Sequence, residues 1–192
     1  MSTQPRRKGK LMRIRTLAMA ATALMCAGCN SGTGTGGSGA THGQFLDACT
    51  LLTAPEAEAI MGQPPLTTTR DTSGGYITSC TYLGKIDSAH GAVIASRLQI
   101  LAFTNAGVHV KNPTVTAQSY VAGLRTTLTA GHWVDVTGVG SDAIYISTVG
   151  KISMYKGDVE SDIVYMPLGH IDTTAAVKAS EIAAGIKIAE KL

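Results

Sequence analysis

The final third of the chain contains four strand-like segments, the last three of which are separated by turns of only two residues, and this spacing restricts the fold more than any other feature. The segments are residues 132–136, 143–148, 151–155 and 158–166. Gly150 and Gly157 lie in the two shortest turns. Such turns join antiparallel neighbours, because a parallel connection needs a crossover of about a dozen residues or more. The sequence therefore predicts an antiparallel meander of four strands.

Three further strands are predicted in the first half of the chain. They cover residues 66–71, 76–83 and 92–103. The third of them shows the clearest alternation of apolar and polar side chains. One of its faces carries Ile94, Leu98, Ile100 and Ala102, and the other carries Arg97 and Gln99. This alternation indicates a strand with one buried face.

The first predicted helix covers residues 53–61. Thr53 and Glu56 have the spacing of a capping box, and Pro55 lies in the first turn. Gly62 follows the segment and is expected to end the helix.

A middle helix is predicted between Asn112 and Gly131. Asn112 is expected to cap it, with Pro113 at its first position. Its apolar stripe consists of Ala117, Val121, Leu124 and Leu128. This helical spacing indicates that the helix covers one face of the sheet.

A long C-terminal helix is expected to begin at an Asp172 cap. Its predicted apolar side consists of Ala175, Ala179, Ile182, Ile186 and Ala189. Lys178, Glu181, Glu190 and Lys191 are predicted to lie on its other sides. Gly185 costs a helix about 1 kcal/mol against Ala, and we interpret it as allowing close packing on the sheet.

Together these segments predict an α+β fold. The expected architecture is a mainly antiparallel sheet of about six to seven strands. A short N-terminal helix, a middle helix and a long C-terminal helix are expected to flank it.

The N-terminal end has the layout of a secretory signal peptide. Its first 28 residues carry six Lys or Arg and no acidic residue, and residues 17–27 form a short apolar run. A membrane-spanning helix needs about 20 apolar residues, so this run is too short to be one. We therefore expect residues 1–28 to be a signal peptide, with either Met1 or Met12 as the true start.

Charge in the rest of the chain argues against a nucleic-acid partner. The whole chain has a formal net charge of +3, but its remaining 10 basic residues face 13 acidic ones. Binding to a phosphate backbone depends on clustered Lys and Arg. The body is mildly acidic, so we expect no nucleic acid among its partners.

Ala27 and Gly28 place two small residues directly before Cys29 at the end of the apolar run. This pattern resembles the lipobox of bacterial lipoproteins, which implies that Cys29 is diacylated with palmitate-type chains and becomes the mature N-terminus. Cys26 stands where the lipobox usually has Leu. The alternative is plain cleavage and release. A Cys26–Cys29 redox motif or zinc half-site is disfavoured, because a glycine-rich tract follows and no second ligand pair has a suitable spacing.

Residues 29–43 are predicted to be the lipidated cysteine and a flexible tether. Six of residues 30–43 are Gly, a composition that cannot form a packed core. Residues 44–192 are predicted to be a single globular domain. Its two cysteines, Cys49 and Cys80, most simply form a disulfide outside the cytoplasm, and two separate buried thiols are the alternative.

Several of these features together resemble a family of uncharacterised bacterial envelope lipoproteins. The matching stretches are Cys49–Gly62 (CTLLTAPEAEAIMG), Ser79–Tyr82 (SCTY) and Val139–Ala143 (VGSDA). The family is similar in outline to PsbP-like sandwich domains, some of which are extracytoplasmic sensors. The resemblance supports a Cys49–Cys80 bridge and implies no catalytic residues.

Two groups of residues are candidate sites of chemistry. A hydrolase would use Ser141, His132 and Asp142, but the Gly138–Asp142 segment lacks the G-x-S-x-G pattern and is interpreted as a turn. A calcium site would use Asp158, Glu160 and Asp162. We interpret these acids instead as the solvated face of an edge strand, where charge prevents aggregation.

The remaining candidates are weaker. His132 and Asp135 alternate along a predicted strand and are expected on opposite faces. Trp133 and the six tyrosines could line a ligand groove, but core and rim positions are more typical of them. The other histidines, His42, His90, His109 and His170, have no metal-ligand spacing. No metal or cofactor site is predicted.

The sequence favours a non-enzymatic, membrane-anchored envelope lipoprotein. Its expected partners are the membrane, through the lipid, and an envelope protein or a small-molecule ligand. The alternatives are an extracytoplasmic ligand-sensing domain and a small envelope hydrolase. Its expected location is the extracytoplasmic side of a bacterial cell envelope.

Overall fold

The computed structural model describes residues 43, 45–72, 75–87, 94–167 and 169–192. The predicted signal peptide, the predicted lipidation site Cys29 and nearly all of the predicted tether lie outside these residues, as do His42 and His90. None of the described helices combines the length and apolar character that a membrane span requires.

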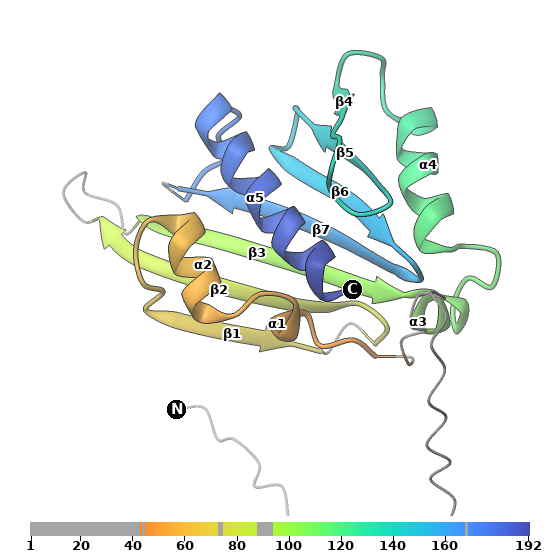
Figure 1. Cartoon of the computed structure of the whole chain (residues 1–192), viewed down its shortest axis with the longest axis horizontal. Coiled ribbons are helices and arrows are strands. Elements are labelled where there is room, and N and C mark those ends of the chain that lie inside the picture. Colours follow the sequence, from red (N-terminus) through yellow and green to blue (C-terminus); the bar gives the residue numbers. More distant parts are fainter. Residues whose placement is uncertain (1–42, 44, 73–74, 88–93, 168) are drawn as a thin grey trace, which may run out of the picture. The chain divides into compact units, whose positions relative to one another are not determined.

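Seven strands form one antiparallel sheet in the order β1-β2-β3-β7-β6-β5-β4 (Figure 1). They are β1 (Thr67–Asp71), β2 (Thr78–Asp87), β3 (Ile94–Thr104), β4 (Trp133–Asp135), β5 (Asp142–Ile146), β6 (Lys151–Lys156) and β7 (Val159–Met166). The predicted C-terminal meander is confirmed as β4 to β7. A second meander, β1 to β3, joins it through antiparallel pairing of β3 with β7. The predicted fold class is therefore confirmed.

Five helices in the described part of the chain accompany the sheet. They are α1 (Ala48–Leu51), α2 (Ala54–Met61), α3 (Asn105–His109), α4 (Ala117–Thr127) and α5 (Ala175–Lys191). The capping box of Thr53 and Glu56 is confirmed at the start of α2, and Gly62 ends that helix in the left-handed conformation. The short helices α1 and α3 were not predicted.

The starts of the two longer helices were predicted wrongly. Helix α4 is capped by Thr116 with Ser119, four residues after Asn112. Helix α5 is capped by Thr174, whose backbone N–H donates to Asp172 Oδ1. In both cases a threonine nearer to the helix is the N-cap, and hydroxyl and carboxylate side chains satisfy first-turn N–H groups equally well.

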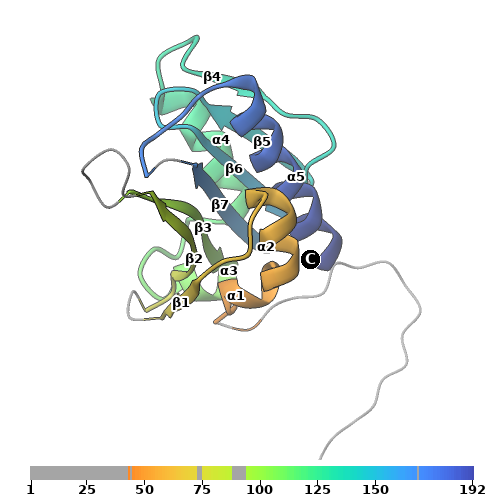
Figure 2. The same cartoon turned by 90° about the vertical axis from the view of Figure 1, so that its left-hand side faces the viewer.

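The two faces of the sheet differ in how they are covered. We call one the closed face: α1, α2 and α5 pack on it, and it carries the main core, including Leu98, Ile100, Ile152 and Ile163. Figure 2 shows these helices on one side of the sheet. We call the other the half-open face: α4 packs on β5, β6 and β7, and α3 packs on β3. Among the described residues, no helix packs on this face of β1 and β2.

The side of α5 that packs on the sheet coincides only in part with the predicted one, since Ala189 is buried and Ile182 packs against the core. Its buried residues are Val177, Glu181, Ala184, Gly185, Ile188 and Ala189, whereas Ala175, Ala179 and Ile186 are exposed. Alanines occur on every side of this helix, so they do not define a face. Gly185 does allow close packing, because a Cβ there would lie 2.8 Å from Val139 Cγ1, but this neighbour belongs to the turn before β5, and the nearest sheet atom, Ile163 Cδ1, would be at 3.5 Å.

The predicted disulfide is present. Cys49 in α1 and Cys80 in β2 are joined, with their Cα atoms 4.9 Å apart. Tyr82, two residues further along β2, donates its hydroxyl proton to the carbonyl of Leu52. The bridge and this hydrogen bond attach the first helices to the closed face.

Candidate functional site

A cavity of about 350 Å³ lies on the half-open face, where α3, α4 and the segment between them meet β3 and β7. Ten residues line it: Tyr76, Ile77, Leu101, Phe103, Val108, Asn112, Val115, Tyr120, Glu160 and Asp162. Most of this lining is apolar or aromatic, and Glu160 and Asp162 are its only acidic or basic residues. A largely apolar cavity with a few polar groups is the usual form of a small-molecule site.

Strand alternation in β7 places the two carboxyl groups in this cavity. Ile163 and Tyr165 belong to the closed-face core, so Glu160 and Asp162 face the other side. The sequence interpretation of a solvated edge strand was wrong. Strand β7 is central, and the exposed fractions of Glu160 and Asp162 are only 2% and 9%. Strand order depends on the β3–β7 pairing, which local sequence patterns do not reveal.

Neighbouring strand β6 supplies polar partners for both acids. Glu160 Oε1 accepts a hydrogen bond of 2.9 Å from Ser153 Oγ. Asp162 Oδ2 lies 2.7 Å from Lys151 Nζ. Asp162 Oδ1 is buried and has no donor among the described residues while both acids are ionised. A proton on Glu160 changes this, because the protonated carboxyl can donate to Asp162.

Burial and the neighbouring Asp162 charge raise the pKa of Glu160 well above its ordinary value, and Asp162 also contributes a hydrogen bond. Ser153 and Lys151 oppose this shift less strongly. Two carboxyl groups in a shared buried site do not readily ionise together. Without a bound cation, the pair is therefore expected to hold one proton.

Aromatic rings form the wall above the acids. Phe103 and Tyr120 pack edge to face, with ring centroids 5.4 Å apart. Burial, together with the charges of Asp162 and Glu160, raises the pKa of the Tyr120 hydroxyl. This hydroxyl stays protonated at neutral pH and can donate.

Helix α4 is held over this face by Arg125. The guanidinium donates to both carboxylate oxygens of Asp142, at 2.6 Å each, and also to Asp135 Oδ1. It lies 5.6 Å from the centroid of the Trp133 ring. These contacts lower the pKa of Asp142, chiefly through its hydrogen bond with Arg125. Asp135, Asp142 and Trp133 are therefore fixed by a structural ion-pair cluster.

The residues of the hydrolase hypothesis do not come together. Trp133 pairs with Ile146, so neighbouring His132 lies at the far end of β5 from Asp142. Asp142 and Ile146 are the two ends of β5, four residue steps or about 14 Å apart. Ser141 is exposed in the turn before β5, where its backbone N–H donates to Tyr155. The turn interpretation is confirmed by the left-handed backbone of Gly138 and Gly140.

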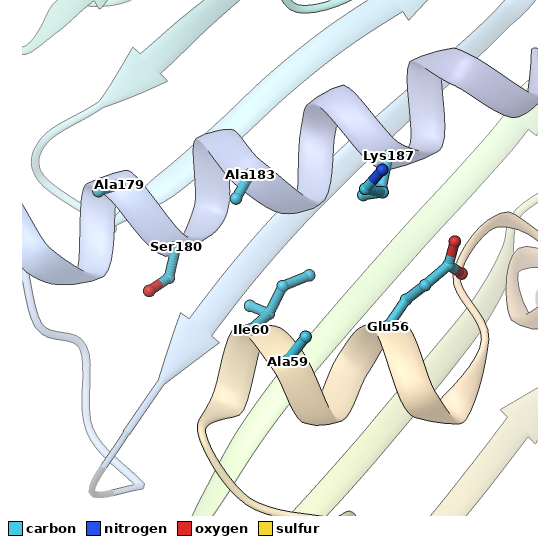
Figure 3. A pocket seen from close by; sticks show the side chains of 7 residues that line it. All are labelled: Glu56, Ala59, Ile60, Ala179, Ser180, Ala183 and Lys187. Atoms are coloured by element: carbon cyan, nitrogen blue, oxygen red, sulfur yellow. The ribbon is translucent and has the colours of Figure 1, made fainter.

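A second hollow, of about 400 Å³, lies between α2 and α5 (Figure 3). It is lined by Ala59, Ile60, Ala179, Ser180 and Ala183, with Glu56 and Lys187 at one end. Both charged groups already have partners, since Glu56 pairs with Lys191 and Lys187 pairs with Glu190. No ionisable group among its lining residues is buried. We therefore favour the cavity of the half-open face as the candidate ligand site.

Glu181 is a third buried acid, and the sequence did not predict its burial. It lies on the closed face with no exposed surface, and its Oε1 accepts a 2.8 Å hydrogen bond from the Tyr165 backbone N–H. Burial raises its pKa to about 8, and the Tyr165 hydrogen bond partly opposes this. Glu181 lines neither hollow.

Other predicted candidates are dispersed. His109 and His170 are exposed, and among the described residues no three His, Cys, Asp or Glu side chains group closely enough to hold a metal ion. Of the aromatic residues considered for a groove, Tyr76 and Tyr120 line the cavity and Trp133 does not.

Comparison of the chain with protein-family models, with curated proteins and with solved structures found no match.

Proposed function

We propose that this chain is a lipid-anchored binding module of the bacterial cell envelope, with its ligand site in the cavity of the half-open face. The observation that carries this proposal is the cavity itself. Its apolar and aromatic walls enclose two buried carboxyl groups, one of which has an oxygen without a donor. A fold that needed only a stable core would gain nothing from burying two acids side by side.

Features outside the cavity support the envelope location. The Cys49–Cys80 disulfide is typical of oxidising compartments. The N-terminal sequence has a signal-peptide layout that ends in Ala27-Gly28-Cys29. The resemblance to envelope lipoproteins, on the Cys49–Gly62 and Ser79–Tyr82 stretches, points the same way.

A non-enzymatic role fits the dispersal of the candidate catalytic residues. Ser141 and His132 lie apart, and Asp142 is already bound by Arg125. The cavity residues offer recognition: an apolar wall for a ligand body and carboxyl groups for a polar end. A sensing role would use the same site and add a signalling partner.

A fragment screen by NMR on the mature protein, purified from a producing bacterium, tests the proposed site. We expect small aromatic fragments to perturb Phe103, Val115 and Tyr120. Val115→Trp would fill the cavity and abolish these shifts, whereas Ala179→Trp, a matched change in the α2–α5 hollow, would preserve them. Shifts that map to the α2–α5 hollow, or no fragment binding at all, would contradict the proposal.

Mass spectrometry of the mature N-terminus tests the anchor. We expect a diacylated Cys29 at the N-terminus and a membrane-associated protein. Cys29→Ala should release the protein from the membrane fraction. An unmodified N-terminus at another residue would contradict the anchor and leave the cavity proposal standing.

A further inference from the structure

We infer that the cavity of the half-open face binds a ligand with a protonated amine and an apolar or aromatic body, and that the amine replaces a proton shared by Glu160 and Asp162. This inference rests on the proposed function, because it identifies the ligand class of the same cavity. It adds a chemical preference and a proton released on binding.

The carboxyl pair carries more negative charge than its described neighbours neutralise when both acids are ionised, so a second cation could bind there. Strand β6 contributes Lys151, which binds Asp162 Oδ2, and the neutral Ser153, which donates to Glu160. Tyr155, also on β6, pairs in register with Glu160. Helix α4 contributes Tyr120, and the lining residues of β3, α3 and the segment before α4 carry no charge. Two acids therefore face a single described cation.

The unpartnered oxygen of Asp162 indicates where the cation would bind. Asp162 is nine-tenths buried, lines the cavity, and has no donor for Oδ1 among the described residues. An ammonium group has three donors, so it can bind Asp162 Oδ1 and Glu160 together. The resulting charge-assisted hydrogen bonds are stronger than neutral ones.

The rest of the cavity selects the body of the ligand. Phe103 and Tyr120 present aromatic surface, and Val108 and Val115 present aliphatic surface. Aromatic rings also attract cations through their faces. The volume of about 350 Å³ suits a small aromatic or short-chain amine.

Other ligand classes fit less well. A bare calcium ion needs six to eight oxygen ligands, and the described residues contain no group of three candidate metal-binding side chains. An anion would meet two carboxyl groups. A neutral apolar ligand would leave Asp162 Oδ1 dependent on the proton of Glu160.

Binding exchanges one cation for another. In the empty site the Glu160 carboxyl is protonated and donates to Asp162. When an ammonium ligand enters, the Glu160 O–H bond breaks, its proton leaves to solvent, and both carboxylates accept N–H donors from the ligand. One proton is thus released for each amine bound, and affinity rises with pH until Glu160 is ionised in the empty protein.

Isothermal titration calorimetry of the mature protein with three isosteric probes tests this inference. The probes are phenethylamine, phenethyl alcohol and hydrocinnamate, which share a phenyl ring and differ in their end group. At about pH 8 we expect the amine to bind at least about tenfold more tightly than the alcohol, and the acid not to bind. At about pH 5.5 the amine should bind at least about tenfold more weakly than at pH 8, because release of one proton changes the affinity about tenfold per pH unit. Titrations at about pH 5.5 in two buffers of different ionisation enthalpy should show release of about one proton.

Variants locate the effect. Glu160→Gln mimics the protonated side chain, so it should fold, lose about tenfold or more in amine affinity, and lose the proton release. Glu181→Gln is the matched control, because it neutralises the buried acid of the closed face, and it should bind as the wild type does. The pH dependence of the wild-type protein gives a test that needs no variant.

The outcomes separate the two proposals. If the alcohol binds as tightly as the amine, or if the amine binds without proton release, the cavity is a ligand site and the amine inference is wrong. If none of the three probes binds and the NMR fragment screen is also blank, both proposals are wrong. If Glu181→Gln weakens amine binding as much as Glu160→Gln does, the inference is also overturned.

Discussion

Two glutamates are buried on opposite faces of the same sheet, and their surroundings differ. Glu181 lies on the closed face, where α5 places it near the C-terminal end of β7 and the Tyr165 backbone N–H donates to it. Glu160 lies on the half-open face, beside a second acid and a cavity. Glu181 thus accepts the hydrogen bond of a backbone N–H group of the sheet. Glu160 lies where a ligand could bind beside it.

The difference shows that burial of an acid does not by itself mark a site. Both glutamates have raised pKa values, and burial is the largest cause for each. Each face leaves one buried carboxyl oxygen without a partner, Glu181 Oε2 on the closed face and Asp162 Oδ1 on the half-open face, so what separates the two glutamates is the cavity and the second acid next to Glu160. A raised pKa in a solid core affects stability, whereas a raised pKa beside a cavity can be linked to binding.

The largest expected effect concerns the closed face alone. Replacing Cys49 and Cys80 together by Ala removes a bridge between residues 31 apart in the sequence. In the chain-entropy model this costs about 4 kcal/mol of unfolding free energy, measurable by urea denaturation. If the two faces act separately, ligand binding by the folded variant is unchanged. A variant that stays folded but no longer binds ligand in the cavity would contradict the claim that the two faces act separately.

The next effect is a pH dependence of stability from Glu181. Its pKa is raised from 4.5 in the unfolded chain to about 8 in the folded one, so its contribution is fully present below about pH 4.5 and is lost as the pH rises toward 8. By about pH 7 the loss is on the order of 3 kcal/mol, since each pH unit between the two pKa values corresponds to about 1.4 kcal/mol. Glu160 acts in the same direction.

Glu181→Gln should remove the part of the pH dependence of stability that comes from Glu181. At about pH 5 its stability should be near that of the wild type. Thermal melts across pH, compared with those of Glu160→Gln, separate the two contributions. If Glu181→Gln leaves the pH dependence of stability unchanged, the account of Glu181 as a buried acid that affects stability is wrong.

A smaller effect is expected at Arg125, which holds α4 over the half-open face. Arg125→Leu removes the hydrogen bonds to Asp142 and Asp135 and should cost about 2 kcal/mol. Arg125→Lys keeps the charge but not the bidentate geometry, and should cost about half as much. Amide hydrogen exchange should speed up in α4 and not in α5. Equal loosening of both helices would mean that the faces are not independent.

The smallest effects are expected at Ser141 and His132. Both are exposed, so Ser141→Ala and His132→Ala should each change the unfolding free energy by less than about 0.5 kcal/mol. Neither should change binding of the fragments that occupy the cavity. A hydrolase screen in which Ser141→Ala abolished an activity of the wild type would support the hydrolase hypothesis instead.

Local patterns in the sequence were enough to predict the meander, the α2 capping box and the antiparallel α+β architecture. Each depends on residues close together in the chain, such as Thr53 with Glu56, or the turns at Gly150 and Gly157. The Cys49–Cys80 bridge was predicted because only two cysteines remain after Cys29 and Cys26 are assigned to the N-terminal region.

The candidate site was not predictable in the same way. Glu160 and Asp162 have the alternation of a strand, and alternation alone does not say whether the strand is central or at an edge. Pairing of β3 with β7, about 60 residues apart in the chain, makes the strand central and buries the acids. Similarly, Glu181 lies among the alanines of α5, where no apolar stripe distinguishes the buried side.

Titration of the side-chain carboxyl carbons of Glu160 and Glu181 by NMR, with and without saturating phenethylamine, tests the assignment of the cavity most directly. We predict that both glutamates titrate above their ordinary value in the empty protein. With the amine bound, the pKa of Glu160 should fall while that of Glu181 stays unchanged, because only Glu160 meets the ligand. An unchanged pKa of Glu160 in the presence of bound amine would contradict the assignment of this cavity as the ligand site for amines.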